Sequence, residues 1–296
     1  MTATAEPEIG RARLRKEDEH LITGRTRWTD NIVLPGMHHL AILRSPVAHA
    51  RITGIDTSAA RSMPGAVAVF TGADLAAEQG SLPCAWQITD DMKAPPAPSL
   101  AVDTVNFAGE AVAVVVARSA YEAQDALEKI DFDYDDLPVV LDLAAATADA
   151  ADLVHPDLGS NISAVWTFDS AEAGTGSDVE EAIRDSEVLV QRTFRQQRLI
   201  PAFMEPRSVV VDPTGPQLTM WSATQIPHIL RLMLAMTLEI PEHKVRVIAP
   251  DVGGGFGGKL QVTPEEVIAL LVARRLGKPV KYTESRSESM LAAHHG

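Results

Sequence analysis

Residues 250–260, PDVGGGFGGKL, combine residue types that are typical of a ligand-binding loop. Five glycines, one phenylalanine and one lysine fall within the seven positions 253–259. Glycine lets a backbone approach a ligand closely, and unpaired main-chain N–H groups favour an anionic partner. Three ligands fit this chemistry: the phosphates of a nucleotide, a dinucleotide and a pterin cofactor. The residues around the loop distinguish between them.

A nucleoside triphosphate loop matches the glycines but not the residues after them. Gly253, four further residues, Gly258 and Lys259 have the required spacing. The next residue should be Ser or Thr, whose hydroxyl binds magnesium, and a helix should begin there at once. Leu260 occupies that position, and a helix is expected only from about Pro264. The sequence therefore disfavours an NTPase.

A dinucleotide fingerprint can be fitted to Gly253, Gly255 and Gly258, with Glu284 as the acidic residue that should follow the next strand. The late start of the helix argues against this motif too. A purely structural turn is a further alternative, although so many glycines destabilise a fold unless close approach to a ligand requires them.

Apolar periodicity places the loop between a strand and a helix. Val245–Ala249 predicts the strand. Thr263 is the expected N-cap of a helix that begins at Pro264, with Glu266 closing a capping box. Gly277 should end this helix, and Val280–Thr283 predicts another strand. Together they predict a β-α-β unit.

The remaining pattern predicts a chain with two domains. Further strands are expected at His39–Arg44, Ala66–Phe70, Glu110–Ala117, Ile130–Tyr134, Ser186–Phe194, Arg207–Asp212 and Leu218–Trp221, and a helix from Ser119 to about Lys129. A second helix follows Gln225, and its apolar residues with a 3.6-residue period are Ile229, Leu232, Met233, Met236 and Ile240. Met220, Met233 and Met236 are expected to fill the core. An Ala- and Asp-rich stretch predicts a boundary near residue 150, with domains at 1–150 and 151–296.

Composition narrows the class of protein. The chain has 296 residues, 46% of them hydrophobic, and a net charge of −14 from 26 Lys and Arg against 40 Asp and Glu. An acidic surface repels nucleic acid. The single cysteine, Cys84, excludes a disulfide framework and an iron–sulfur cluster held by this chain alone, and a partly buried side chain is expected for it. No apolar run has the length of a membrane span or a signal peptide, so we expect a cytoplasmic protein.

Several motifs in order resemble the large subunit of the molybdenum hydroxylase family, which includes xanthine dehydrogenase, aldehyde oxidase and aerobic carbon monoxide dehydrogenase. Residues 24–52, 67–75 and 105–117 resemble its amino-terminal α/β hammerhead domain. FMEPR at 203–207, WSATQIPH at 221–228 and PDVGGGFGGK at 250–259 resemble its first molybdopterin-binding domain. The resemblance implies an α+β fold, in which the hammerhead domain precedes an incomplete mixed α/β molybdopterin-binding domain.

The resemblance also implies a cofactor, a reaction and partners. A molybdenum–molybdopterin centre, expected in its cytosine dinucleotide form, oxidises a small molecule with oxygen derived from water. The electrons pass through a 2Fe-2S subunit to an FAD-binding subunit. In such enzymes the cofactor carries the chemistry, and the protein positions it.

Matched by position, Gln225 corresponds to the family glutamine whose amide approaches the molybdenum oxo ligand. Gly254, Gly255, Phe256 and Gly257 correspond to the loop that presents main-chain amides beside the metal. No catalytic or metal-ligating residue is assigned to this chain.

Glu205 and Arg207 also match the family pattern, and two roles are open for them. They either form ion pairs that support the loop or contact the cofactor. The sequence alone does not decide between these roles.

Two departures from the family pattern qualify the resemblance. Leu260 stands where purine-oxidising members carry an acidic residue that binds substrate, which favours a carbon monoxide dehydrogenase-like enzyme over a purine oxidase. Family subunits are more than twice as long, and their later part, the carboxy-terminal half of the subunit, holds the catalytic glutamate base. The alternative to an enzyme component is therefore a truncated, non-catalytic binding or assembly module of the same fold.

Overall fold

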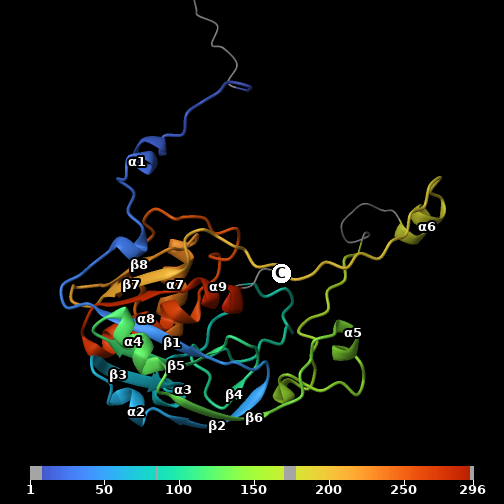
Figure 1. Ribbon diagram of the computed structural model, residues 1–296. Coiled ribbons are helices and arrows are strands. Elements are labelled where there is room, and N and C mark those ends of the chain that lie inside the picture. The colour runs from blue at the N-terminus through green and yellow to red at the C-terminus, as the bar shows by residue number, and fades with distance from the viewer. Residues whose placement is uncertain (1–8, 85, 170–177, 294–296) are drawn as a thin grey trace, which may run out of the picture.

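A mixed seven-stranded sheet forms the centre of the computed structural model, which describes residues 9–84, 86–169 and 178–293 (Figure 1). Its strand order is β3-β5-β1-β10-β7-β8-β9. These strands are β1 His38–Arg44, β3 Ala66–Thr71, β5 Ala111–Ala117, β7 Ser208–Asp212, β8 Leu218–Ser222, β9 Val245–Ile248 and β10 Val280–Thr283. A three-stranded antiparallel sheet has the order β4-β2-β6, with β2 Ala50–Asp56, β4 Thr104–Val105 and β6 Asp131–Asp136.

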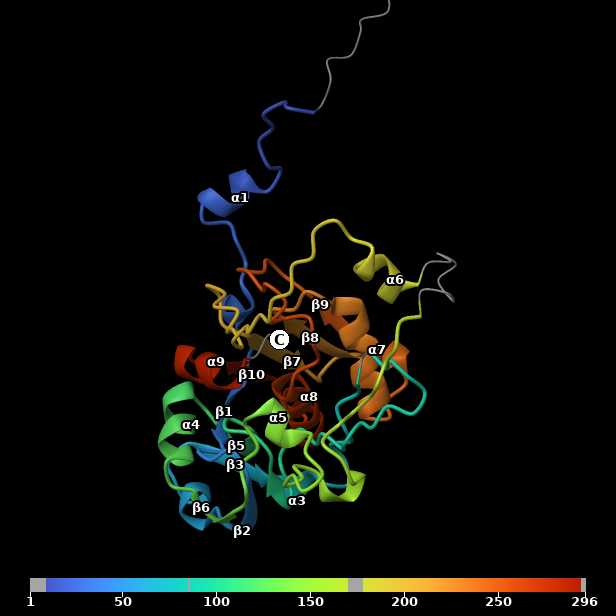
Figure 2. The same cartoon turned by 90° about the vertical axis from the view of Figure 1, so that its right-hand side faces the viewer.

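Helices pack on both faces of the large sheet (Figure 2). The α-helices are α1 Asp18–Ile22, α2 Ser58–Arg61, α3 Gly72–Leu75, α4 Ala120–Leu127, α5 Leu143–Ala146, α6 Val179–Arg184, α7 Pro227–Thr237, α8 Pro264–Leu276 and α9 Arg286–Ala292. Short 3-10 turns lie at Thr29–Asn31, Pro156–Leu158 and Glu242–Lys244. The expected α+β class is confirmed.

The large sheet joins the early and late parts of the chain. β1 lies between β5, with which it is antiparallel, and β10, with which it is parallel. Strands from before and after residue 150 therefore share one hydrogen-bonded sheet. The boundary near residue 150 stays a prediction.

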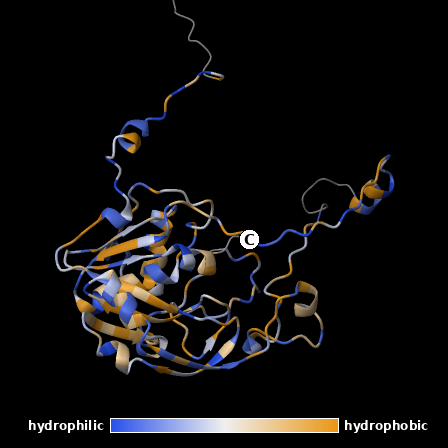
Figure 3. Cartoon of the chain, viewed as in Figure 1, coloured by the Kyte–Doolittle hydropathy of each residue, from blue (hydrophilic) through white to orange (hydrophobic). Residues whose placement is uncertain are grey.

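α8 is the central helix of the core. Every side chain from Val267 to Ala273 is buried, and these residues pack with apolar residues of β1, β5, β7, β8 and α7. α2 and α4 cover the opposite face of β1, β3 and β5. Hydrophobic residues accordingly colour the strands of the body in Figure 3. Removal of this apolar area from water is the main term that stabilises the fold.

The residues at both ends of α8 are those that the sequence predicts. Thr263 and Glu266 form a capping box at its start. Gly277 ends the helix in the left-handed conformation, with φ of 62°. β10 follows and lies in the same sheet as β9, so the expected β-α-β unit is present with β7 and β8 between its strands.

Two predictions about buried surfaces were wrong. The apolar face assigned to α7 lies largely outside: Ile229, Leu232 and Met236 are exposed, with Met236 61% accessible. Leu230 and Leu234, one position further along, fill the core in their place. Both stripes are apolar, so periodicity alone could not choose between them. Cys84 is exposed as well, because it lies in the irregular segment before residue 101.

The predicted strand at Ser186–Phe194 is also wrong. The segment from 186 to 198 has no regular secondary structure and is exposed throughout, and together with α6 it forms an arm that extends away from the body (Figures 1 and 2). Its exposed apolar side chains include Val188, Leu189, Val190 and Phe194. A strand needs a neighbour for its main-chain hydrogen bonds, and no described strand lies beside it.

No helix in the described part of the chain is long and apolar enough to cross a membrane.

Candidate cofactor-binding site

The glycine loop and Gln225 leave the large sheet at the same edge. β8 and β9 are parallel neighbours, with Trp221 opposite Ile248. Gln225 follows β8 by three residues, and the loop follows β9. The carboxyl ends of adjacent parallel strands bring their following loops together, and ligands commonly bind there. The fold thus places the two predicted segments side by side.

The main chain of Lys259 holds Gln225 through two hydrogen bonds. The Gln225 main-chain N–H donates to the Lys259 carbonyl at 3.0 Å, and the Lys259 N–H donates to Gln225 Oε1 at 3.3 Å. Of the two ends of the side-chain amide only the oxygen can accept from an N–H group, so this contact fixes the orientation of the amide. The donor Nε2 has no acceptor in the described part of the chain.

Gly255 is necessary for this arrangement. A Cβ atom at residue 255 would lie 2.3 Å from Gln225 Oε1. That separation is far shorter than a van der Waals contact, so any larger residue would displace the glutamine side chain. Gly255 is therefore a point of close approach between the loop and Gln225.

The loop presents a run of unpaired main-chain donors. Within the described residues, the N–H groups of Gly254, Gly255, Phe256 and Gly257 have no acceptor. The backbone turns sharply here, with φ of 92° at Gly254, 49° at Phe256 and 87° at Gly257. A positive φ strains a phenylalanine, and Phe256 is 70% exposed. Unpaired N–H groups in such a turn form a binding surface for anionic groups.

Glu205 closes the base of the loop. Its Oε2 atom accepts from the Gly253 N–H at 2.7 Å and from Lys259 Nζ at 3.0 Å. Lys259 is only 2% exposed, and its ammonium group lies 4.8 Å from the centre of the Phe203 ring. Burial lowers the pKa of Lys259, and the Glu205 carboxylate opposes that shift. For Glu205, the structure shows the ion pair that supports the loop.

Arg207 belongs to a second, larger ion-pair network. Its guanidinium donates to Glu284 at 3.0 Å and lies 3.5 Å from Glu265, which also pairs with Arg44. Burial disfavours ionisation of Glu265, but Arg207 and Arg44 outweigh it and lower the pKa of that carboxyl to about 2. Glu284, the residue that mimicked a dinucleotide fingerprint, serves this network.

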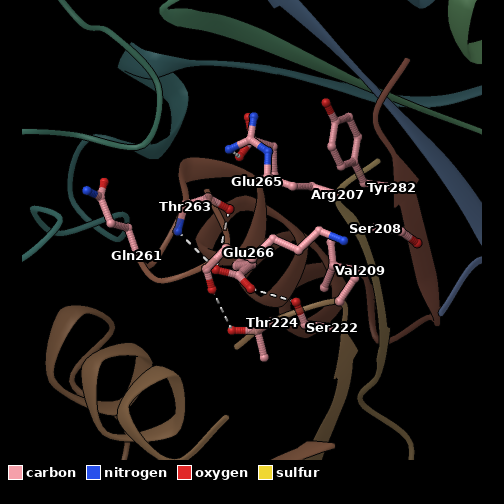
Figure 4. Close-up of a pocket in the computed structure, with 12 residues that line it drawn as sticks. Arg207, Ser208, Val209, Ser222, Thr224, Gln261, Thr263, Glu265, Glu266 and Tyr282 are labelled. Carbon is pink, nitrogen blue, oxygen red and sulfur yellow. Dashed lines mark hydrogen bonds and ion pairs between the residues drawn. The ribbon is translucent and has the colours of Figure 1, made fainter. Parts of the chain in front are cut away.

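Glu266, at the start of α8, is a buried carboxyl group close to the loop in sequence. Glu266 accepts from the Ser222 hydroxyl at 2.6 Å and from the Thr263 N–H at 2.9 Å (Figure 4). Burial raises the pKa of Glu266 to about 7. Glu266 links β8, which leads to Gln225, with α8, which follows the loop.

The loop also borders a cavity of about 230 Å³. Gly257 and Gly258 form one side of it, and Phe107 and Glu110 from the segment before β5 form another. Burial raises the pKa of Glu110 to about 6. Both halves of the chain therefore contribute to the surroundings of the loop.

Sequence reasoning missed the roles of Lys259 and Glu266. Lys259 was an unassigned lysine of the glycine loop, and Glu266 was expected only to cap α8. An acidic residue in FMEPR and a lysine in the loop were the available signals for the Glu205–Lys259 pair, but no spacing rule connects residues 54 positions apart. For metals, no cluster of three or more His, Cys, Asp or Glu side chains suits an ion within residues 9–84, 86–169 and 178–293.

Comparison with protein families identifies both parts of the chain. Residues 23–138 match the a/b hammerhead domain of aldehyde oxidase and xanthine dehydrogenase, and residues 154–296 match the molybdopterin cofactor-binding domain. The chain is 38% identical over 290 residues to the nicotine 6-hydroxylase large subunit of Paenarthrobacter nicotinovorans, covering 97% of this chain and 34% of the relative. It is 35% identical to the carbon monoxide dehydrogenase large chain of Hydrogenophaga pseudoflava, covering 93% and 35%.

Solved structures show the same relationship. Quinoline 2-oxidoreductase from Pseudomonas putida 86 superposes with a TM-score of 0.86 at 38% identity, covering 98% of this chain and 36% of that protein. A Cu,Mo-CO dehydrogenase gives a TM-score of 0.81 at 32% identity, covering 95% and 36%. The chain thus spans about a third of the length of these relatives. With both domains matched in order, the chain belongs to the molybdenum hydroxylase family of xanthine dehydrogenases, aldehyde oxidases and carbon monoxide dehydrogenases.

Proposed function

We propose that this chain is the amino-terminal part of a molybdenum hydroxylase large subunit, carbon monoxide dehydrogenase-like, which oxidises a small molecule with water-derived oxygen. One observation carries the proposal. The N–H groups of residues 254–257 and the Nε2 group of Gln225 are donors without acceptors in the described chain, and they lie at one edge of the sheet. A molybdenum–pterin centre is an electron-rich group that such donors suit.

Each residue of this site has a defined part. The main-chain N–H groups of Gly254, Gly255, Phe256 and Gly257 would donate to anionic ligand atoms of the cofactor, and Gln225 Nε2 would donate to its oxo ligand. Fixed donors aimed at an oxygen that gathers charge stabilise that charge without reorganisation. When bound, the centre supplies the two-electron oxidation and the oxygen transfer. The exposed Phe256 ring would exclude water beside it.

The remaining two thirds of the subunit completes the proposed enzyme. The relatives are about three times as long as this chain, and in the proposed enzyme the general base and the opposite wall of the site would come from the remaining part of the subunit. The exposed apolar residues Val188, Val190 and Phe194 of the arm support such a partner, because exposed apolar side chains grouped on one segment suit an interaction site. Subunits that carry FAD and 2Fe-2S clusters would accept the electrons, in the cytoplasm.

The test is co-expression of the chain with the remaining part of its large subunit and with the FAD and 2Fe-2S subunits. We expect about one molybdenum per assembly, and a pterin that releases a cytosine nucleotide on hydrolysis. A Gln225→Ala assembly is the matched control: it should retain molybdenum because the loop amides remain, but lose turnover. An assembly that purifies intact without molybdenum would contradict the proposal.

A further inference from the structure

One carboxylate oxygen joins the two ends of the glycine loop. Gly253 and Lys259 lie six positions apart, yet the N–H of one and the ammonium of the other both donate to Glu205 Oε2, at 2.7 and 3.0 Å. The Glu205 N–H also donates to the Gly253 carbonyl at 3.1 Å. Glu205 therefore holds the two ends of the loop together. It does so from the segment that precedes β7, which is distant from the loop in sequence.

The same lysine holds Gln225 on its other side. While Lys259 Nζ contacts Glu205, its main-chain N–H and carbonyl bind Gln225 at 3.3 and 3.0 Å. The contacts therefore form a line from Glu205 through Lys259 to Gln225. A shift of the Lys259 backbone would change the position of the glutamine amide.

Because Lys259 is buried, the contacts from Glu205 through Lys259 to Gln225 depend on the charge of Glu205. Lys259 is 2% exposed, and an ammonium group at such a position requires an anionic partner. Among the described residues, Glu205 is the carboxylate paired with it. If Glu205 became neutral, Lys259 would gain by moving toward water, and its backbone would move with it because glycines on its amino-terminal side offer little resistance.

We propose that Glu205 is a positioning residue: through Lys259 it keeps the glycine loop closed and holds the Gln225 amide with Nε2 outward. The proposal deepens the proposed function, since Nε2 is the donor assigned there to the cofactor. The ion pair and the loop closure themselves are properties of this chain without any cofactor, so they can be measured separately.

Hydrogen–deuterium exchange of the purified 296-residue chain tests the loop closure. In Glu205→Gln and in Lys259→Met we expect the hydrogen-bonded amides of a peptide that contains residues 253–260 to exchange at least about tenfold faster, while β7 and β10 peptides keep their rates. The double variant should exchange no faster than the single variants, because both break one contact. Glu242→Gln, which breaks the exposed pair with Arg231, is the control and should leave the loop unchanged.

A second readout reports on Gln225 directly. In protein with ¹⁵N-labelled glutamine side chains, Gln225→Glu identifies the Gln225 NH₂ signal by its absence. We expect this signal to be distinct in the unchanged chain and to move to the position of a freely exposed glutamine in Glu205→Gln and Lys259→Met.

The proposal is overturned if both variants leave the Gln225 signal and loop exchange unchanged, or if all core peptides exchange faster to the same degree, which would indicate general destabilisation. If Glu205→Gln does not fold, Lys259→Met, which leaves no buried ammonium group without a partner, decides on the same criteria. A chain that passes these tests but binds no molybdenum after assembly would contradict the proposed function and leave this inference intact.

Discussion

Arg44 on β1 and Glu265 on α8 form a buried ion pair, with Nη2 and Oε1 2.6 Å apart, that connects the early and late parts of the chain. Arg44 also contacts Glu288 and the Tyr282 hydroxyl, and Glu265 also contacts Arg207. A buried pair loses far more when one partner is removed than an exposed pair does, because the other charge stays behind without compensation.

We therefore expect Arg44→Met to lower the free energy of unfolding by about 3 kcal/mol. Arg231→Met, which removes the partner of Glu242 in an exposed pair, should cost less than about 1 kcal/mol. Urea denaturation monitored by circular dichroism measures both. Equal losses in the two variants would show that the buried network does not hold the two parts together.

The raised pKa of Glu266 leads us to expect that the free energy of unfolding decreases as the pH rises. Its folded pKa of about 7 lies above the ordinary value of 4.5, so the folded chain binds a proton more tightly than the unfolded chain. This contribution is complete below pH 4.5, decreases between pH 4.5 and 7, and is absent above pH 7. The loss amounts to about 3 kcal/mol, the equivalent of the shift between those two pKa values.

Glu266→Gln should remove most of this slope, because a neutral amide can accept from the Thr263 N–H and donate to the Ser222 hydroxyl. The measurement is the unfolding free energy at about pH 5 and about pH 8, on either side of most of the titration. We expect the variant to be at least as stable as the unchanged chain at the higher pH. The contribution of Glu110, whose pKa burial also raises, has the same sign and should remain in the variant. A full slope in the variant would rule out Glu266 as its source.

The start and end of α8 could be predicted because local chemistry determines them. Thr263, Pro264 and Gly277 act within one turn of the helix, and the structure places each as expected. The late start of this helix, which argues against a phosphate loop, is present in the structure. Contacts such as Arg44 with Glu265 join residues 221 positions apart, and no local pattern encodes them.

The wrong predictions have a common physical origin. α7 has two apolar stripes, and Ser186–Phe194 contains the β-forming residues Val188 and Val190, so both segments have apolar surface that a single sheet does not cover. Apolar periodicity predicts that a surface will be buried, but it does not predict which part of this chain or which other chain will cover it. The site residues Gln225 and 254–257 stay predictions for the same reason, because their ligand is outside the chain.

Gly255→Ala tests the close approach to Gln225. A Cβ atom there would lie 2.3 Å from Gln225 Oε1, so the glutamine must move, whereas the rest of the fold should change little because the contact is with the end of a side chain. We expect the assembled enzyme to lose about a hundredfold in turnover, the scale for loss of one preorganised donor. Gly215→Ala is the control, since its Cβ would meet only an atom at 3.6 Å. Unchanged turnover in Gly255→Ala would argue against a role for the Gln225 amide.

The arm provides a test of the missing partner. Val188→Lys together with Val190→Lys places two charges on exposed side chains, so the unfolding free energy of the chain alone should change by less than about 0.5 kcal/mol. Association with the remaining part of the large subunit, measured by co-purification and by sedimentation, should fall at least tenfold. Val67→Lys, at an exposed valine of β3, is the control. Normal assembly of the arm variant would show that the arm is not part of that interface.

Leu260 leads us to expect that purines are not substrates of the complete complex. Its side chain is 50% exposed beside the loop and can form no hydrogen bond with a polar ring. A site that lacks a required polar partner discriminates strongly against the substrate that needs it. We therefore expect no measurable xanthine-dependent dye reduction by the complete complex, and a gain of xanthine binding in Leu260→Glu. Leu291→Glu, a similarly exposed leucine of α9, should produce no such gain. Efficient xanthine turnover by the unchanged complex would refute this restriction, because Leu260 would then be compatible with purine oxidation.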